Sequence, residues 1–208
     1  MERTKKQHIP FVIATKNEDK VMEIREILRE FPFEIRTMTE AGVEDDIEEN
    51  GTSFEENALI KALAVHSRIG GFVMADDSGL AIDALGGAPG IYSARFNGTG
   101  SSYPEKIQAL WKLLADIPLE MRTAHFICAI AVVFPDGSHF TVQESLDGIF
   151  YDKIIGENGF GYDPVFFLPE KGLTTAQLSP AEKHKISHRG KALHAMLAQL
   201  RDAWYSFS

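Results

Sequence analysis

Cysteine is nearly absent from this sequence, and apolar runs are short. The single cysteine, Cys128, excludes an intrachain disulfide and is typical of a reducing compartment. The longest apolar run, residues 126–134, has nine residues, about half of what a membrane-spanning helix needs. The first residues, MERTKKQH, are charged and precede no apolar segment, which argues against a secretory signal. These absences predict a cytoplasmic protein without a membrane partner, in which Cys128 is an inert buried thiol.

Basic residues are also in short supply. The 208 residues contain 21 Lys and Arg against 30 Asp and Glu, a net charge of −9. A nucleic-acid partner is therefore not expected, because surfaces that bind its phosphates need clustered Lys and Arg. A small anion can still bind where a few basic groups gather. The length and a hydrophobic content of 44% predict one globular domain over residues 1–208, built as one body or as two lobes.

Apolar periodicity and capping signals predict alternating strands and helices in the first half of the chain. Strands are expected at 9–15, 33–38 and 72–76, and helices from Asn17, over 53–71 and over 101–118. Residues 122–134 and 138–146 flank a PDG turn and predict a hairpin. Two helices, 179–186 and 188–204, close the chain. This order predicts an α/β fold with a mixed sheet.

Two stretches place polar residues beside helix starts. In ATKNEDK (14–20), Thr15, Asn17 and Lys20 lie where free N–H groups favour an anion, although the glycines of a Walker loop are missing. In IEENGTSFEENALIK (47–61), two glutamates precede a turn glycine and Lys61 follows on a helix. Taken alone, the first stretch is more typical of a capped helix with solvated charges, and the second of a solvated acidic loop.

The stretch MADDSGLAIDALGGAPGIYSARF (74–96) follows a strand that is apolar enough to be buried on both faces. Asp76 and Asp77 come where we expect this strand to end, and ligands of open α/β sheets collect at the carboxyl ends of strands. Adjacent carboxylates repel each other, but Mg²⁺ is held by one or two carboxylates together with substrate phosphate oxygens. For Arg95, a ligand contact and a structural ion pair stay open.

Two motifs near the C-terminus complete the candidate site. NGFGYDP (158–164) places aromatic residues and an acid in a glycine-flanked loop, as a stacking platform or as a core plug. SHRG (187–190) places His188 and Arg189 at the start of a helix, where the helix dipole disfavours cations. A pair that defies local preference is a functional candidate.

Taken in order, five blocks resemble the Ham1-type inosine/xanthosine triphosphate pyrophosphatases. They are TKNEDK, GTSFEENALIKA, DDSGLAIDALGGAPGIYSARF, GFGYDP and LSPAEKHKISHRGKAL, which together span residues 15–193. The resemblance implies an ITPase-like fold with two lobes around an elongated mixed sheet, flanking helices, a nucleotide in the central cleft, and a homodimer. It also implies Mg²⁺-dependent hydrolysis of the triphosphates ITP, dITP and XTP to the monophosphate and pyrophosphate.

The resemblance further implies a role for each matching residue. Asp77 would be general base and metal ligand, supported by Asp76, and Glu48 would help to bind the metal, with Glu49 as the alternative. The phosphate-binding residues would be Thr15, Lys16, Asn17, Glu18, Asp19, Lys20 and Lys61. The substrate-binding residues would be Ser78, Phe160, Gly161, Tyr162, Asp163, Lys183, His188 and Arg189. Among these, Phe160 would stack on the base, His188 and Arg189 would donate to its 6-oxo group, and Asp163 would accept from N1–H.

Two positions depart from the family pattern. Many relatives have a small residue in place of Lys16 and glycine in place of Asp19, so the extra acid either weakens phosphate binding or points outward. Two other functions stay open. One is a Maf-like nucleotide pyrophosphatase with a different base preference, and the other is a non-catalytic nucleotide-binding regulator. The combined presence of Asp77, Glu48 and Lys20 argues against the regulator.

Overall fold

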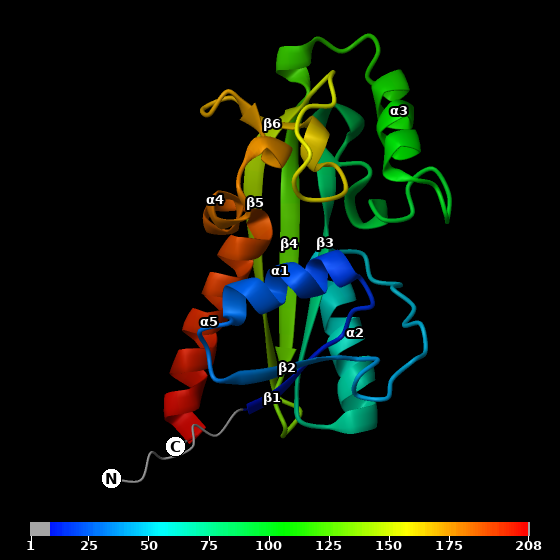
Figure 1. Ribbon diagram of the computed structural model, residues 1–208. Coiled ribbons are helices and arrows are strands. Elements are labelled where there is room, and N and C mark those ends of the chain that lie inside the picture. The colour runs from blue at the N-terminus through cyan, green and yellow to red at the C-terminus, as the bar shows by residue number, and fades with distance from the viewer. Residues whose placement is uncertain (1–8, 208) are drawn as a thin grey trace. The chain divides into compact units, whose positions relative to one another are not determined.

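The computed structural model describes residues 9–207 (Figure 1). Over this range the helices are α1 (Glu18–Leu28), α2 (Phe54–Ile69), α3 (Tyr103–Leu113), α4 (Pro180–Ile186) and α5 (His188–Phe207). The strands are β1 (Ile9–Ile13), β2 (Phe33–Thr37), β3 (Phe72–Ile82), β4 (Thr123–Val133), β5 (His139–Phe150), β6 (Phe166–Leu168) and β7 (Leu173–Thr174). None of the helices described is long and apolar enough to cross a membrane.

The strands form one mixed sheet in the order β2-β1-β3-β4-β5-β6-β7. β1 is parallel to β2 and to β3, whereas β6 is antiparallel to β5 and to β7. β4 and β5 are joined by a turn in which Phe134 N donates to Ser138 O at 2.8 Å, so the predicted hairpin is confirmed. The α/β class and the mixed sheet are confirmed as well.

The described chain divides into two compact units. The first comprises residues 9–77, 129–142 and 193–207, and the second comprises 78–128 and 143–192. Strands β3, β4 and β5 are long because each continues from one unit into the other.

In the first unit, α1 and α2 bury one apolar face each. Val21, Ile24 and Leu28 are the buried residues of α1. Ser53 and Glu56 have the spacing of a capping box, and Ser53 caps α2 by accepting from Glu56 N. The carboxylate of Glu56 accepts from the backbone N–H and the hydroxyl of Thr52.

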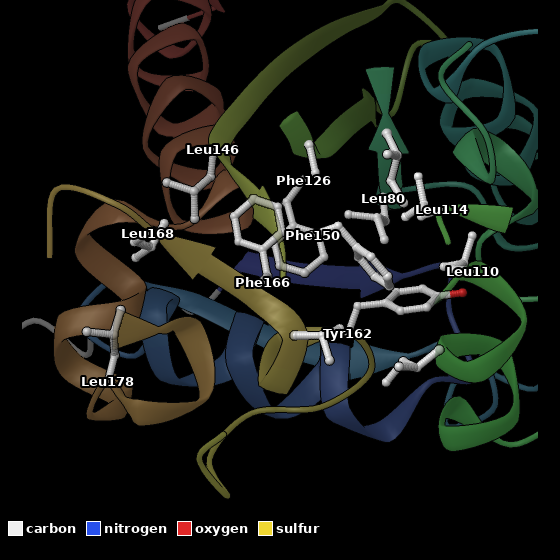
Figure 2. Packing of buried hydrophobic residues seen from close by; sticks show 14 residues of the cluster. Leu80, Leu110, Leu114, Phe126, Leu146, Phe150, Tyr162, Phe166, Leu168 and Leu178 are labelled. Atoms are coloured by element: carbon white, nitrogen blue, oxygen red, sulfur yellow. The ribbon is translucent and has the colours of Figure 1, made fainter. Parts of the chain in front are cut away.

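The second unit has its own apolar core (Figure 2). Phe126 of β4 stacks on Phe166 of β6 with ring centroids 4.0 Å apart. Leu80 and Ile82, both fully buried, reach this core from the end of β3. Tyr162 is 4% exposed and belongs to the same core, next to the loop that carries Phe160.

The prediction that β3 ends near Asp76 is wrong. β3 runs on to Ile82, because Leu80 and Ile82 extend its apolar alternation into the core of the second unit. The parallel pairing of β1 with β3, however, stops at Ile13 and Met74. The aspartates therefore lie just beyond the carboxyl end of β1, in the middle of β3.

Candidate functional site

The turn before α1 has the features of an anion site. Asn17 caps the helix, since its Oδ1 accepts from Lys20 N at 3.2 Å, and Asn17 N donates to Thr15 Oγ1 at 3.2 Å. The side chains of Glu18 and Asp19 are exposed. The acidic side chain at position 19 is therefore in contact with solvent.

Lys16, the other departure from the family pattern, reaches away from this turn. Its Nζ donates to Glu44 O and lies 2.7 Å from Asp46 Oδ1, and both side chains are largely exposed. Surface ion pairs of this kind contribute little to stability. The contact nevertheless ties the turn to the segment that leads to the acidic loop 48–49.

Two lysines converge on the aspartates of β3. Lys20 Nζ of α1 forms an ion pair with Asp76 Oδ1, whose side chain is completely buried. Lys61 Nζ of α2 lies 2.7 Å from Glu49 Oε1 and 3.2 Å from Asp77 Oδ1, and donates to Asp76 O at 2.8 Å. We refer to these five residues, all in the first unit, as the lysine–carboxylate cluster.

The second carboxylate oxygen of Asp77 stands out within the lysine–carboxylate cluster. Asp77 Oδ2 is buried and accepts no hydrogen bond within residues 9–207. Leaving a buried carboxylate oxygen unsatisfied is costly, which points to a group that binds there. With three carboxylates against two ammonium groups, the cluster also carries excess negative charge.

Burial and charge shift the pKa values of Asp77 and Lys61. Burial is the main reason that the pKa of Asp77 is raised; the attraction of Lys61 and Lys20 opposes this shift without cancelling it. Burial lowers the pKa of Lys61, but the charges of Asp77, Glu49 and Asp76 outweigh burial and raise it overall. Lys61 therefore stays charged, while Asp77 takes up a proton more readily than an ordinary aspartate. That is a property of a general base.

The loop before α2 brings Glu49, rather than Glu48, into the lysine–carboxylate cluster. Glu48 is exposed, whereas 23% of the Glu49 side chain is accessible. Asn57, fully buried and one helical turn before Lys61, accepts from Gly51 N at 2.9 Å. A Cβ at Gly51 would lie 2.8 Å from Asn57 Oδ1, so only glycine fits this close approach. Asn57 was not predicted from the sequence, because nothing in the apolar pattern of this helix marks it as a functional residue.

The cluster can accept a hard divalent cation with help from a ligand. Within the described residues, no group of three or more His, Cys, Asp or Glu is arranged to hold a metal ion by itself. Mg²⁺ needs only one or two protein carboxylates when phosphate oxygens and water complete its octahedron. The free Asp77 Oδ2 and the neighbouring Glu49 fit that requirement.

A second group of candidate residues gathers around Phe160 in the second unit. Lys183 Nζ lies 5.2 Å from the centroid of the Phe160 ring, and Arg189 Cζ lies 5.5 Å from it. Arg189 is 2% exposed and donates from Nη2 to Ser78 Oγ at 2.9 Å. Cations at such distances from a ring centroid are attracted to the face of the aromatic ring. We call Ser78, Phe160, Asp163, Lys183 and Arg189 the Phe160 group.

Asp163 has both carboxylate oxygens occupied. Oδ2 accepts from Phe160 N at 2.8 Å and from Lys183 Nζ at 2.7 Å, and Oδ1 accepts from Thr175 Oγ1 at 2.8 Å. Its side chain is 4% exposed. Its expected role, accepting from N1–H of a base, would use a further lone pair of these oxygens, since each carboxylate oxygen can accept more than one hydrogen bond. Sequence reasoning missed Thr175, because a threonine outside the motifs carries no signal.

The other candidates in this unit surround the Phe160 group. His188, 7% exposed, stacks on Phe126 with ring centroids 4.9 Å apart. Gly161 has a φ of 69°, and a Cβ there would lie 3.3 Å from the Tyr103 ring. Tyr162 turns into the core, where its hydroxyl donates to Ser93 O at 3.1 Å. For Arg95, the structure shows a guanidinium 5.1 Å above the Tyr92 ring, a structural contact.

Comparison with known proteins covers nearly the whole chain. The profile of the Ham1 family matches residues 11–199. The dITP/XTP pyrophosphatase of Caldanaerobacter subterraneus subsp. tengcongensis is 48% identical over 184 residues, which cover 88% of this chain and 91% of that protein. The dITP/XTP pyrophosphatase of Bacillus subtilis is 45% identical over 182 residues, which cover 88% of this chain and 92% of the relative.

Solved structures share the fold. The structure of a HAM1 protein from Coxiella burnetii superimposes with a TM-score of 0.85 at 38% identity, over 93% of this chain and 99% of that one. The Staphylococcus aureus Ham1 protein gives a TM-score of 0.84 at the same identity and coverage.

Proposed function

This chain belongs to the Ham1 family, and we propose that it is a nucleoside triphosphate pyrophosphatase that acts on deaminated purine nucleotides. It would hydrolyse ITP, dITP and XTP to the monophosphate and pyrophosphate. The names of its relatives support the reaction and the substrates. In the structure, the observation that carries the proposal is the buried Asp77 carboxylate, with one oxygen beside Lys61 and the other without a partner.

The assembly and location form part of the same proposal. Residues 1–208 would act as one catalytic domain, a homodimer of the cytoplasm that clears such nucleotides from the pool. Large apolar side chains of the second unit support a dimer, since Tyr92, Leu113 and Met121 are each more than half exposed. Sedimentation should then give twice the chain mass of 23.1 kDa.

The triphosphate would bind at the lysine–carboxylate cluster and at residues 15–20. The start of α1 offers free N–H groups, and Lys20 and Lys61 supply ammonium charges. The side chains of Glu18 and Asp19 are acidic and exposed, so these two residues would contribute through their backbone N–H groups.

Mg²⁺ is the ion proposed, held by Asp77 and by one glutamate of the pair 48–49. The contact of Glu49 with Lys61 favours Glu49, and the exposure of Glu48 makes it the weaker candidate. Bound Mg²⁺ would supply positive charge that neutralises the triphosphate and polarises the reacting phosphorus.

Asp77 would act as the general base. The oxygen of a water molecule attacks the α-phosphorus while Asp77 takes its proton. The bond from the α-phosphorus to the bridging oxygen breaks, and pyrophosphate leaves with the electron pair. Lys20 and Lys61 stabilise the negative charge that develops on the leaving group. The raised pKa of Asp77 suits this proton transfer.

The purine base would bind at the Phe160 group. Phe160 is half-buried and offers a ring for stacking. Lys183 and Arg189 beside it are donors that suit the 6-oxo group of hypoxanthine and xanthine, and reject the 6-amino group of adenine. His188 would be a further donor to the 6-oxo group, and Ser78, Gly161 and Tyr162 would hold this arrangement. Asp163 would orient Lys183 and accept from N1–H of the base.

The decisive test measures pyrophosphate release from a panel of common and deaminated purine and pyrimidine triphosphates, with Mg²⁺ and with a chelator. We expect release from ITP, dITP and XTP only with Mg²⁺, and far slower release from ATP. An Asp77→Asn preparation purified in parallel reports any contaminating phosphatase. A preference for modified or pyrimidine nucleotides would instead favour the Maf-like alternative.

A further inference from the structure

Thr175 is a buried threonine that contacts the Phe160 group without belonging to it. It follows β7 at the start of a short 3-10 segment, Thr175–Gln177, and is 1% exposed. Its Oγ1 donates to Asp163 Oδ1 at 2.8 Å and lies 3.1 Å from Asp163 O. The hydroxyl thus contacts one carboxylate oxygen of Asp163, and Lys183 contacts the other.

Asp163 connects this hydroxyl to two residues proposed to contact the base. Through Oδ2 it accepts from Phe160 N and from Lys183 Nζ. The packing around this carboxylate is tight, because a Cβ at Gly159 would lie 2.1 Å from Asp163 Oδ2 and 3.0 Å from Lys183 Nζ. A carboxylate held at both oxygens cannot rotate, so it fixes the ammonium group and the loop together.

We propose that Thr175 is a positioning residue for base selection, which acts through Asp163 on Lys183 and Phe160. This inference rests on the proposed function. If the hydroxyl is removed, Oδ1 loses its donor and the carboxylate is free to turn. Asp163 then no longer fixes the positions of Lys183 and of the Phe160 loop. The ammonium group of Lys183, which would distinguish a 6-oxo from a 6-amino group, is no longer held in the right place.

The neighbouring residue provides a matched control. Thr174 is also fully buried, and its hydroxyl donates to the backbone oxygen of Ile155 at 2.6 Å instead of to Asp163. Thr174→Val and Thr175→Val therefore remove the same group at the same depth. Thr175→Ser keeps the hydroxyl and should rescue what Thr175→Val loses.

The experiment measures dissociation constants of inosine monophosphate and adenosine monophosphate by calorimetry without metal, and the melting temperature of each variant. It also compares kcat and KM for ITP and ATP. For Thr175→Val we expect the preference for the inosine nucleotide to fall roughly tenfold, mainly through affinity and KM. Thr174→Val and Thr175→Ser should keep the wild-type preference, even where Thr174→Val melts at a lower temperature.

Three results would overturn the inference, and they can be distinguished from one another. A wild-type protein that prefers inosine nucleotides, together with a folded Thr175→Val variant of unchanged preference, overturns the role of Thr175 alone. An equal fall in preference for Thr174→Val and Thr175→Val does so as well, because it reduces the effect to general packing. A wild-type protein that binds both monophosphates equally, and cleaves neither triphosphate, overturns the proposed function and the inference with it.

Discussion

Lys61 Nζ lies 3.2 Å from Oδ1 of Asp77, while Oδ2 of the same carboxylate is buried and accepts no hydrogen bond within residues 9–207. One oxygen of Asp77 thus contacts Lys61, and the other is available for the reaction. A substitution of Asp77 is therefore expected to change both the activity and the stability of the protein. Each effect can be measured by itself.

Asp77→Asn keeps the volume of the side chain and removes its charge. We expect kcat for ITP to fall by about 10² to 10⁴, the range typical of a lost general base. Pyrophosphate release measures the loss, and circular dichroism checks the fold. Asp136→Asn in the β4–β5 turn, an exposed position, is the control and should keep full activity. Near-normal turnover by folded Asp77→Asn would contradict the assignment.

The same substitution should change how stability depends on pH. The folded-state pKa of Asp77 is raised above the ordinary value of 3.8, mainly by burial. The folded protein therefore binds this proton more tightly, and stability falls as pH rises from the ordinary pKa through the raised one. The Asp77→Asn variant has no carboxyl group to titrate at this position, so it does not lose stability in this way. With chelator present, its melting temperature relative to wild type should rise as the pH increases above the ordinary aspartate pKa of 3.8. A difference that does not change with pH would contradict the raised pKa.

Lys20 should affect all substrates alike, because a point charge on the triphosphate does not read the base. We expect Lys20→Ala to lower kcat/KM for ITP and XTP by a common factor of roughly 10 to 100. Lys112→Ala, at an exposed position of α3, is the control for loss of positive charge. If the ratio of the two substrates changed tenfold, Lys20 would be misassigned.

Arg189 should affect substrates unequally. Arg189→Lys keeps the charge of this buried residue but loses the planar fork that donates to Ser78. We expect kcat/KM for ITP to fall by roughly 10 to 100 while the slow ATP reaction hardly changes. Kinetics on both triphosphates measure this contrast. Equal proportional losses on ITP and ATP would mean that Arg189 serves structure or phosphate binding.

His125 predicts a separate pH effect on stability. Its Nδ1 lies 2.8 Å from Asp147 Oδ1 and its Nε2 lies 3.1 Å from Asp83 Oδ2, contacts that together raise its pKa. The stabilisation is therefore complete below the ordinary histidine pKa of about 6.5 and is lost as pH rises through the raised one. The melting temperature of His125→Gln should fall furthest below wild type near about pH 6. His139→Gln, at an exposed position, is the control, and a pH-independent deficit would contradict the prediction.

The sequence by itself determined the helices, most of the strands, the mixed sheet and the family, but it did not predict the short strands β6 and β7. Helix caps such as Asn17 and Ser102, the PDG turn and the apolar stripes act over a few residues, so their structural consequences can be read locally. The motif residues Phe160, Lys183 and Arg189 were also selected from sequence, and the structure brings them together.

Only the tertiary structure decided which partner each polar group takes. β3 continues past Asp77 because Leu80 and Ile82 find a core supplied by distant segments. Glu49 reaches Lys61, and the oxygens of Asp163 are taken by Lys183 and Thr175, residues 20 and 12 positions away. Contacts across such separations depend on how whole elements pack, and a local pattern does not contain that information.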